Sequence, residues 1–375
     1  MNILFVIDKF PVGGGIETVT RILSNEFIMR GHKIWVCCFS QGKSNVFVNE
    51  QIKILQFHQK GNTVQNIKFL NRILICENIN IIINQEYPLK TVILCSKARI
   101  GTSAKLISVH HFSLIINPYA RIGFFAKILP SRLVYNLKKY RDIKRRNLTY
   151  KYSDAIVFLS QKFIEQYKKL QPRKNLDRLY AIADPLENFC KEPPNFENKN
   201  KIIIFVARMV EREKRLSLVL KIWELLYEKN PEWNLLFLGD GEDLPILREK
   251  AKKFPRVEFL GFQNPKPYYE KASILLQTSA KDFEGFGMTL AEAQKNACIP
   301  IAMDSYLSLS DIIENGKNGF IVSNNDVNAM AEKIQILINH PALRREIALN
   351  GVQTSKKFDV KLLANEWEKL FAEIL

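Results

Sequence analysis

Short apolar runs alternate along the first half of the chain with segments whose apolar residues recur every three or four positions. The run Met1–Asp8 predicts a first strand, and the spacing of Val19, Ile22 and Phe27 predicts a helix after it. Further strand-like runs follow at Lys33–Phe39, Ile52–Phe57, Asn80–Asn84, Lys105–Val109 and Asp154–Ser160. Strands that alternate with helices predict a doubly wound α/β domain, in which ligands collect beyond the carboxyl ends of parallel strands.

The second half of the chain repeats the same pattern. Lys201–Val206 is almost entirely apolar, as in a strand whose sheet is covered on both faces. Further strands are predicted at 234–238 and 272–277, with a helix over 216–227 and a final helix over 362–375. Between the halves, residues 187–200 have the composition of a linker. The sequence therefore predicts an amino-terminal domain over residues 1–190 and a second domain over residues 198–355.

The composition is that of a globular protein. With 375 residues, 47% of them apolar and 25% charged, the chain is long enough for two domains with sizeable cores. Its six cysteines form no C-x-x-C motif and show no metal-ligand spacing, so we expect buried reduced thiols in a cytosolic protein. The first residues lack the features of a signal peptide, and no run reaches the roughly 18 apolar residues of a membrane span.

The positive charge of the chain is concentrated in its first half. Residues 1–197 hold 30 Lys and Arg against 14 Asp and Glu, whereas the remainder holds 25 against 24. No zinc finger, helix-turn-helix or RNA-binding motif accompanies the basic residues, so nucleic acid is not the expected partner. An anionic membrane surface explains the excess equally well, since each basic residue near such a surface contributes on the order of 1 kcal/mol. The alternative is a basic domain without any such partner.

The densest basic segment follows a hydrophobic but interrupted segment at 112–130. It sets seven positive residues against the single acid Asp142. The seven are Lys138, Lys139, Arg141, Lys144, Arg145, Arg146 and Lys151. A hydrophobic segment joined to a basic helix is typical of a surface that lies on anionic lipid. We therefore expect the protein to be peripheral on the inner face of the cytoplasmic membrane; the alternative is a solvated helix face beside a core segment.

Two glutamates flank a glycine-rich turn after the predicted strand at 272–277. Glu284 precedes Gly285-Phe286-Gly287, and Glu292 completes Thr289-Leu290-Ala291-Glu292, which fits a capping box. Strand, turn and helix start together predict an anion site, because unpaired N–H groups and the helix dipole point the same way. We interpret it as a site for a diphosphate and a ribose. In the alternative interpretation Glu292 only caps its helix and Glu284 is an exposed loop acid.

The spacing of these glutamates, with seven residues between them, resembles the signature of glycosyltransferase family 4. A second block, Phe205–Arg215, is similar to the family segment in which an Arg and a Lys hold the donor diphosphate. Arg208 and Lys214 stand at those positions here. A glycine often follows that Lys, and this chain has Arg215 instead. The resemblance continues in the family's order through Leu236–Glu242, Val257–Phe262 and Asn315–Val322.

The resemblance implies a GT-B fold, in which two Rossmann-like doubly wound domains face each other across a cleft. A last helix, here at 356–375, would cross back to the first domain. In that domain Gly14-Gly15-Ile16-Glu17 resembles a family loop at the cleft, and a histidine after a strand lies beside the transferred sugar. His110 and His111 both fit that position, and the neighbouring residues favour His111; alternatively the histidine only hydrogen-bonds backbone. Family members often carry Asn-Pro where this chain has Asp184-Pro185.

The resemblance also implies a role for each site residue. Arg208 and Lys214, with backbone N–H groups between Gly287 and Leu290, would stabilise the charge on the leaving diphosphate. Glu292 would accept hydrogen bonds from the ribose hydroxyls. Glu284 would lie by the donor sugar ring, and would act neither as a nucleophile nor as a general base. The remaining predicted donor-binding residues are Gly14, Gly15, Gly285, Phe286, Met288 and Thr289.

The predicted function is that of a retaining hexosyltransferase that uses a nucleotide sugar, with UDP-sugars favoured. The acceptor would be a glycan or a lipid-linked precursor of capsule, O-antigen or lipopolysaccharide. The acidic turn Asp240–Asp243 resembles a family loop that binds no metal, so we expect neither metal nor cofactor besides the donor. The alternatives are a nucleotide-sugar epimerase of the same fold and a non-enzymatic glycan- or nucleic-acid-binding module. No motif encodes the sugar, the acceptor or the linkage.

Overall fold

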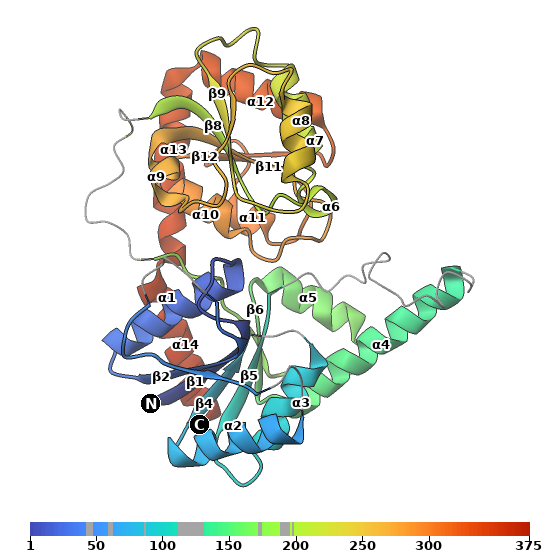
Figure 1. Ribbon diagram of the computed structural model, residues 1–375, viewed down its shortest axis with the longest axis vertical. Coiled ribbons are helices and arrows are strands. Elements are labelled where there is room, and N and C mark those ends of the chain that lie inside the picture. The colour runs from blue at the N-terminus through green and yellow to red at the C-terminus, as the bar shows by residue number, and fades with distance from the viewer. Residues whose placement is uncertain are drawn as a thin grey trace. The chain divides into compact units, whose positions relative to one another are not determined.

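The computed structural model describes residues 1–42, 48–58, 63–85, 88–111, 131–171, 175–187, 196 and 199–375, with backbone alone for 131–138. The chain divides into two compact units, Met1–Glu187 with Val360–Leu375, and Asn188–Asp359. Figure 1 shows each unit as a sheet flanked by helices. The hydrophobic segment at 112–130 and most of the expected linker at 187–200 lie outside the described residues.

The sheet of the first unit runs in the order β3-β2-β1-β4-β5-β6-β7, and the pairings between these strands are parallel. Its strands are β1 Asn2–Lys9, β2 Lys33–Ser40, β3 Lys53–Gln56, β4 Ile81–Asn84, β5 Lys105–His110, β6 Ala155–Phe158 and β7 Leu179–Ala181. Its helices are α1 Gly15–Met29, α2 Val64–Cys76, α3 Leu89–Ala98, α4 Ser131–Tyr152, α5 Gln161–Leu170 and α14 Val360–Ile374.

Strand β1 shows how this sheet is covered on both faces. Leu4 and Val6 belong to a core shared with helices α2 and α3. Phe5 points the other way, because successive side chains of a strand alternate. Its ring lies 6.5 Å from that of Phe27 in α1, which in turn lies 5.6 Å from that of Phe371 in α14. The last helix therefore completes the apolar cover of the first unit.

The second unit is built by the same rule. Its sheet runs in the order β10-β9-β8-β11-β12-β13, again with parallel pairings. Its strands are β8 Asn200–Val206, β9 Asn234–Leu238, β10 Val257–Phe259, β11 Ala272–Gln277, β12 Ile299–Met303 and β13 Phe320–Val322. Its helices are α6 Glu211–Lys214, α7 Leu216–Glu224, α8 Leu244–Ala251, α9 Lys266–Lys271, α10 Met288–Lys295, α11 Leu309–Ile312, α12 Val327–Asn339, α13 Pro341–Ser355 and the 3₁₀ helix η3 Lys356–Phe358. The predicted fold class, two doubly wound parallel α/β domains, is confirmed.

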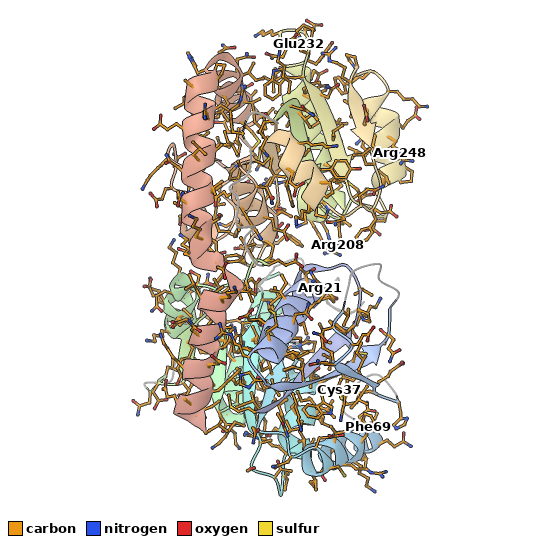
Figure 2. The ribbon with its side chains drawn as sticks, turned by 90° about the vertical axis from the view of Figure 1, so that its left-hand side faces the viewer. Arg21, Cys37, Phe69, Arg208, Glu232 and Arg248 are labelled. Atoms are coloured by element: carbon orange, nitrogen blue, oxygen red, sulfur yellow. The ribbon has the colours of Figure 1, made fainter. Side chains whose placement is uncertain are left out.

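The described cysteines are reduced, and most of them are buried. Cys37, Cys38, Cys95 and Cys298 lie in the interior, whereas Cys76 at the end of α2 is exposed, so the expectation of buried thiols is wrong for that residue. Burial raises the pKa of the Cys95 and Cys298 thiols to about 12. Figure 2 labels Cys37 in β2, which belongs to the core of the first unit, and Phe69 in α2, which is partly buried and packs against that core.

Helix α4 carries the basic segment, but its positive side chains do not share one environment. Arg146 is only 2% exposed, and its carbonyl accepts a hydrogen bond from the Tyr167 hydroxyl at 3.2 Å. Arg145 pairs with Asp142 at 2.7 Å. The exposed members among the described side chains are Lys139, Arg141, Lys144 and Lys151. Arg146 is therefore not part of the exposed basic face of this helix. Among the described residues, no helix is both long and apolar enough to cross a bilayer.

Candidate active site

The candidate residues of the second unit lie at the carboxyl edge of its parallel sheet. Arg208 follows β8, and Ser279 and Glu284 follow β11. Figure 2 shows Arg208 and Glu232 at opposite ends of this unit; Glu232 precedes β9 and so marks the amino edge. The carboxyl edge is the one at which ligands of doubly wound sheets collect.

Arg208, in the turn after β8, has a side chain that is exposed to solvent but fixed by one ion pair. The Arg208 side chain is 72% exposed, and its Nη2 pairs with Glu213 Oε2 at 2.7 Å. Glu213 is only 16% exposed, and its carbonyl accepts from the Ala280 amide at 2.8 Å. The short helix α6 is thereby tied to the loop after β11. Arg208 is thus a cation that an anionic ligand could reach and that a fixed carboxylate orients.

Lys214 and Glu284 form the central pair of the site. Lys214 Nζ pairs with Glu284 Oε1, and the two side chains are 14% and 17% exposed. The Ser279 hydroxyl donates to the same carboxylate oxygen at 2.6 Å. The alternative in which Glu284 is an exposed loop acid is therefore wrong. A positive and a negative group shielded from water and fixed by hydrogen bonds form a preorganised electrostatic environment.

The glycine-rich turn ends in an unusual backbone at Gly287. Its φ of +98° lies in the left-handed region, and a Cβ there would overlap the Tyr306 hydroxyl. Gly287 is also the N-cap of α10, with no side-chain cap. The predicted capping box is therefore wrong, because Thr289 lies inside the helix and not at its N-cap. Tyr306, which follows β12, leaves no room for a side chain at this N-cap.

Only part of the predicted anion-binding stretch can face a ligand. Phe286 is 3% exposed and packs its ring 5.0 Å from that of Phe358, and Leu290 is fully buried. The Leu290 amide already donates to the Gly287 carbonyl at 2.9 Å. Met288 and Thr289 are half-buried, and they are the first two residues of α10, whose amides have no acceptor within the helix. The amides of Met288 and Thr289 are therefore the best candidates for an anion.

The carboxylate of Glu292 is fixed by a hydrogen bond from a buried tyrosine. The hydroxyl of Tyr269 in α9 donates to Glu292 Oε2 at 3.1 Å. Tyr269 is 1% exposed, and burial together with the charge of Glu292 raises the pKa of its hydroxyl well above the ordinary value. The hydroxyl therefore stays protonated and acts as a donor that fixes one carboxylate oxygen. Glu292 is thus oriented by a partner from another helix, which a capping box does not include.

The two candidate histidines, His110 and His111, lie at the end of β5 and are both buried. His110 stacks on Phe158 with the ring centroids 5.0 Å apart, and its side chain belongs to the interior beside Tyr167. His111 Nε2 lies 2.6 Å from Gln85 Oε1. Burial lowers the pKa of His110 to about 3 and that of His111 to about 4, so both rings are neutral at pH 7. The alternative of a histidine bonded only to backbone is wrong for His111.

Asp184 completes the His111 cluster. Its Oδ1 lies 3.6 Å from His111 Nδ1, and burial raises the pKa of this carboxyl to about 7. Asp184 occupies the position at which family members often carry asparagine. A protonated Asp184 keeps the uncharged character of an asparagine, and the departure from the family pattern therefore changes the charge of this site only when the carboxyl ionises.

The loop at Gly14 and Gly15 has ordinary backbone angles. Gly14 is extended, with φ −145°, and forms the N-cap of α1, and Gly15 is the first helical residue. Neither glycine therefore adopts a backbone conformation that is barred to other residues. A Cβ on Gly14 would collide with the Glu17 carboxylate, whereas a Cβ on Gly15 would meet open space. Close approach of a ligand to Gly15 stays a prediction.

Several residues that bind the predicted site residues were not predicted from the sequence. Ser279, Glu213 and Tyr269 bind the predicted residues of the second unit, and Gln85 binds His111. Each comes from a segment whose own pattern indicates a strand end or a helix, and nothing in that pattern shows which side chain it meets. The position of Ser279 directly after a buried strand was the one available signal.

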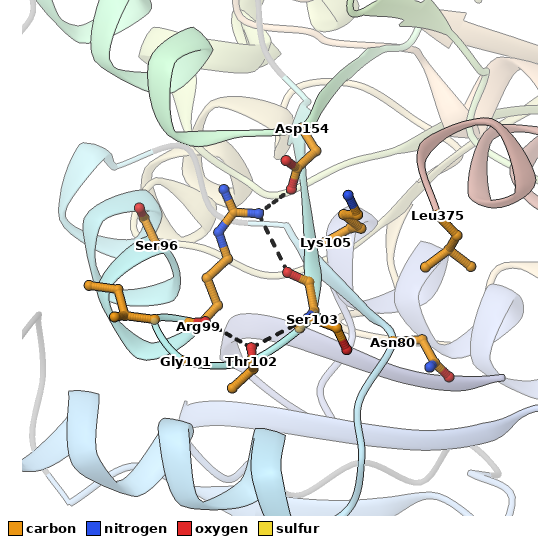
Figure 3. A pocket seen from close by; sticks show the side chains of 11 residues that line it. Asn80, Ser96, Arg99, Gly101, Thr102, Ser103, Lys105, Asp154 and Leu375 are labelled. Carbon is orange, nitrogen blue, oxygen red and sulfur yellow. Dashed lines mark hydrogen bonds and ion pairs between the residues drawn. The ribbon is translucent and has the colours of Figure 1, made fainter.

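A separate hollow of about 700 Å³ lies in the first unit, at the amino ends of β4 and β5 (Figure 3). Its Arg99 is engaged with Asp154, with the Ala104 carbonyl at 3.5 Å and with the Tyr152 carbonyl at 2.9 Å. The hollow therefore lies at the edge opposite His110 and His111, and its charged group serves to join α3 to β6. Among the described residues, no three His, Cys, Asp or Glu side chains gather as they would around a metal ion.

Two family models match the chain. The model described as Glycosyltransferase Family 4 matches residues 13–182, and the model described as glycosyl transferases group 1 matches residues 187–354. Together they account for both units.

The chain is similar to curated glycosyltransferases, two of them over nearly their full length. The Campylobacter jejuni GalNAc-α-(1→4)-GalNAc-α-(1→3)-diNAcBac-PP-undecaprenol α-1,4-N-acetyl-D-galactosaminyltransferase is 25% identical, covering 100% of this chain and 99% of the relative. An uncharacterized glycosyltransferase of Haemophilus influenzae is 24% identical over 97% of this chain and 98% of its own. The poly(ribitol-phosphate) α-N-acetylglucosaminyltransferase of Staphylococcus aureus is 28% identical over 52% of this chain and 40% of its own.

Solved structures agree on the fold. HepE of Anabaena, in complex with UDP-glucose, superposes with a TM-score of 0.76 at 16% identity over 100% of both chains. TarM of Staphylococcus aureus superposes with a TM-score of 0.74 at 15% identity, covering 99% of this chain and 98% of its own. The two parallel sheets, the matched family models and these relatives show that the chain belongs to glycosyltransferase family 4 and has the GT-B fold.

Proposed function

We propose that this glycosyltransferase moves a sugar from a UDP-sugar, with retention of configuration, to a glycan or lipid-linked acceptor in cell-surface polysaccharide synthesis. The observation that carries the proposal is the hydrogen-bonded set of Lys214, Glu284 and Ser279 at the carboxyl edge of the second sheet. UDP is suggested by the structural neighbours, which were solved with UDP-glucose or UDP. The acceptor class is suggested by relatives that act on an undecaprenol-linked glycan or a polyol-phosphate polymer.

The leaving diphosphate would be stabilised by groups that need no rearrangement. Lys214 Nζ has three donor hydrogens and uses one of them for Glu284. Arg208 lies at the same edge, and Glu213 engages one of its terminal nitrogens, so its other N–H groups can donate to a phosphate. The amides of Met288 and Thr289 add dipoles of the right sign. Fixed donors of this kind stabilise developing negative charge more effectively than water, which must reorient.

Glu284 would position the donor sugar without entering the bond changes. Its Oε1 already accepts hydrogen bonds from both Lys214 and Ser279, so that oxygen is poorly placed to attack the donor sugar. In a retaining transfer of this type the leaving phosphate oxygen takes the proton of the acceptor hydroxyl as the new glycosidic bond forms on the same face. No metal ion enters this scheme, so we expect activity in EDTA.

The exposed basic residues of α4 would bind the anionic surface on which a lipid-linked acceptor lies. Lys139, Arg141 and Lys144 fall within two turns of the helix and point to solvent. Attraction to anionic lipid of about 1 kcal/mol per residue would make this binding reversible and sensitive to salt. Vesicle flotation tests it, and equal partition onto neutral and anionic vesicles would contradict it.

A donor panel followed by NMR tests the enzymatic proposal. UDP-glucose, UDP-galactose, UDP-GlcNAc, UDP-GalNAc and GDP-mannose are each incubated with the protein and with Lys214→Ala, and the first sugar anomer released is recorded. We expect slow hydrolysis of one UDP-sugar with the α-anomer released first, and hydrolysis about 100-fold slower in the variant. Lys221→Ala, an exposed lysine in α7, is the matched control and should hydrolyse normally. Release of the β-anomer would contradict retention, and conversion into an epimeric UDP-sugar would favour the epimerase.

A further inference from the structure

Arg215 has a backbone conformation that side chains rarely adopt. It ends α6 and precedes α7, with φ +50° and ψ +53° in the left-handed region. This is the position at which the family often carries glycine, for which the left-handed region is accessible without strain. An arginine is retained here at a conformational cost, so its side chain must form interactions that a glycine could not supply.

The guanidinium of Arg215 joins its own turn to two other segments of the second unit. Its Nε donates to the Thr278 carbonyl at 2.5 Å, and a terminal nitrogen donates to the Ser279 carbonyl. The other terminal nitrogen donates to Asn324 Oδ1 at 2.6 Å and to Asn325 Oδ1, in the loop after β13. The rigid fork of five N–H donors fits several acceptors at once, which a lysine ammonium on a flexible chain does not.

These bonds close a ring that contains the central ion pair. Thr278 Oγ1 donates back to the Lys214 carbonyl at 2.7 Å, so the end of β11 and the end of α6 bind each other in both directions. Ser279, whose carbonyl accepts from Arg215, donates its hydroxyl to Glu284 at 2.6 Å. Glu284 pairs with Lys214, the residue before Arg215. Both members of the pair are therefore tied to the same guanidinium through one intervening residue.

We propose that Arg215 is a positioning residue for sugar transfer, which fixes Lys214 and Glu284 relative to each other without touching the donor. The inference rests on the proposed function, because it takes Lys214 and Glu284 as groups of the donor site. A purely structural role is the competing account, and it predicts a loss of stability that is independent of Lys214. Because misplacement of a catalytic group by about 1 Å can lower a rate as much as 100-fold, the positioning role predicts an effect on turnover.

The chain supplies a matched control in Arg256. It too has a left-handed backbone, with φ +58°, and its guanidinium donates to the Trp233 carbonyl at 3.0 Å and the Tyr227 carbonyl at 2.6 Å. Arg256 immediately precedes β10, however, and so lies at the amino edge of the same sheet. Arg215→Gly and Arg256→Gly are thus the same substitution at two left-handed arginines that bind carbonyls, one at each edge.

The experiment is a double-mutant cycle on hydrolysis of the UDP-sugar that the donor panel identifies. It compares kcat, KM and Tm for Arg215→Gly, Arg256→Gly, Lys214→Ala and Lys214→Ala/Arg215→Gly. We expect kcat to fall about 10-fold in Arg215→Gly and to stay within about twofold in Arg256→Gly, with both losing thermal stability. In the Lys214→Ala background, Arg215→Gly should change kcat by less than about twofold, because one member of the pair that it holds together is gone. Millimolar guanidinium should partly restore kcat in Arg215→Gly alone.

Two outcomes overturn the inference, and they differ from failure of the function itself. If Arg215→Gly lowers kcat as much in the Lys214→Ala background as in the native chain, Arg215 does not act through Lys214. If Arg256→Gly lowers kcat equally, the effect is one of general stability. If instead Lys214→Ala retains full turnover, the proposed donor site is wrong whatever Arg215 does.

Discussion

The two units are both built of parallel strands and covering helices, yet they differ in whether their positive side chains are paired or exposed. In the second unit the candidate cations are paired: Arg208 with Glu213 and Lys214 with Glu284. The sequence from residue 198 onward is correspondingly close to neutral. In the first unit the candidate histidines are buried and neutral, and the excess positive charge stands on exposed residues such as those of α4.

The two arrangements of charge act on a ligand in different ways. A charge that is shielded from water and fixed by hydrogen bonds acts strongly on one nearby ligand. Exposed charges of one sign act weakly but together, over distances that salt limits to about 10 Å at 0.1 M. The second unit is therefore suited to the chemistry of a single diphosphate, and the first to contact with an extended anionic surface.

The sharpest way to break the comparison is to remove the paired cation. Lys214→Ala should lower kcat about 100-fold, the usual loss when one preorganised electrostatic donor is removed. It should also lower the free energy of unfolding, because Glu284 is left with an unpaired charge at 17% exposure. Urea unfolding and sugar-nucleotide hydrolysis measure the two effects separately.

The double variant Lys214→Met/Glu284→Gln separates the effect of the ion pair on turnover from its effect on stability. With no unpaired charge left it should unfold at a urea concentration near that of the native chain, while turnover stays as low as in Lys214→Ala. Native turnover in this variant would show that the pair belongs to the scaffold alone.

A substitution at Gly287 tests whether the candidate site of the second unit depends on a fixed backbone. Gly287→Ala should lower the free energy of unfolding by about 3 kcal/mol, because it combines left-handed strain with overlap on Tyr306. Gly316→Ala is the control: φ is +81° there, but a Cβ would meet open space, so strain alone should cost about 1 kcal/mol. Equal losses in the two variants, measured by urea unfolding, would show that Tyr306 yields without cost.

The sequence predicted most of the fold but only part of the site. The apolar runs at Asn234–Leu238 and Ala272–Gln277 are strands with those bounds, since a buried parallel strand is a local pattern. The capping box at Thr289 failed because α10 begins two residues earlier than Thr289 would cap it, at a glycine whose close contact with Tyr306 no local pattern reveals. Arg215 was noted as a departure from the family, but its left-handed backbone and its carbonyl partners depend on segments far away in the chain.

The buried acid of the first unit makes a prediction that depends on pH. The pKa of Asp184 is raised from 3.8 to about 7, so between these values the folded chain holds a proton that the unfolded chain has lost. Stability therefore falls as pH rises through this window, and the loss is complete above pH 7. His111, which faces Asp184, shifts the other way because its pKa is lowered to about 4.

Asp184→Asn isolates the carboxyl from that opposing contribution. Relative to the native chain, the variant should gain about 2 kcal/mol in free energy of unfolding when the pH goes from 5 to 8. Asp177→Asn, an exposed acid of the same unit, should show no such gain. Parallel curves for native chain and Asp184→Asn in urea unfolding at both pH values would contradict a buried, protonated Asp184.

The smallest effect per residue is expected on the exposed basic face of the first unit. Replacing Lys139, Arg141 and Lys144 together by Gln should weaken binding to phosphatidylserine vesicles by about 1 kcal/mol per residue, because each removes one attraction to anionic lipid. The matched control replaces Arg248, Lys250 and Lys252, three exposed basic residues in and just after α8 of the second unit, where Figure 2 labels Arg248. Binding of the control variant should still weaken at high salt, whereas binding of the first variant should depend little on salt. The reason is that salt screens the attraction to anionic lipid, which the first variant has lost. If both variants float alike, the excess charge of the first unit is not a membrane-binding surface, and the contrast between the units would reduce to one of composition.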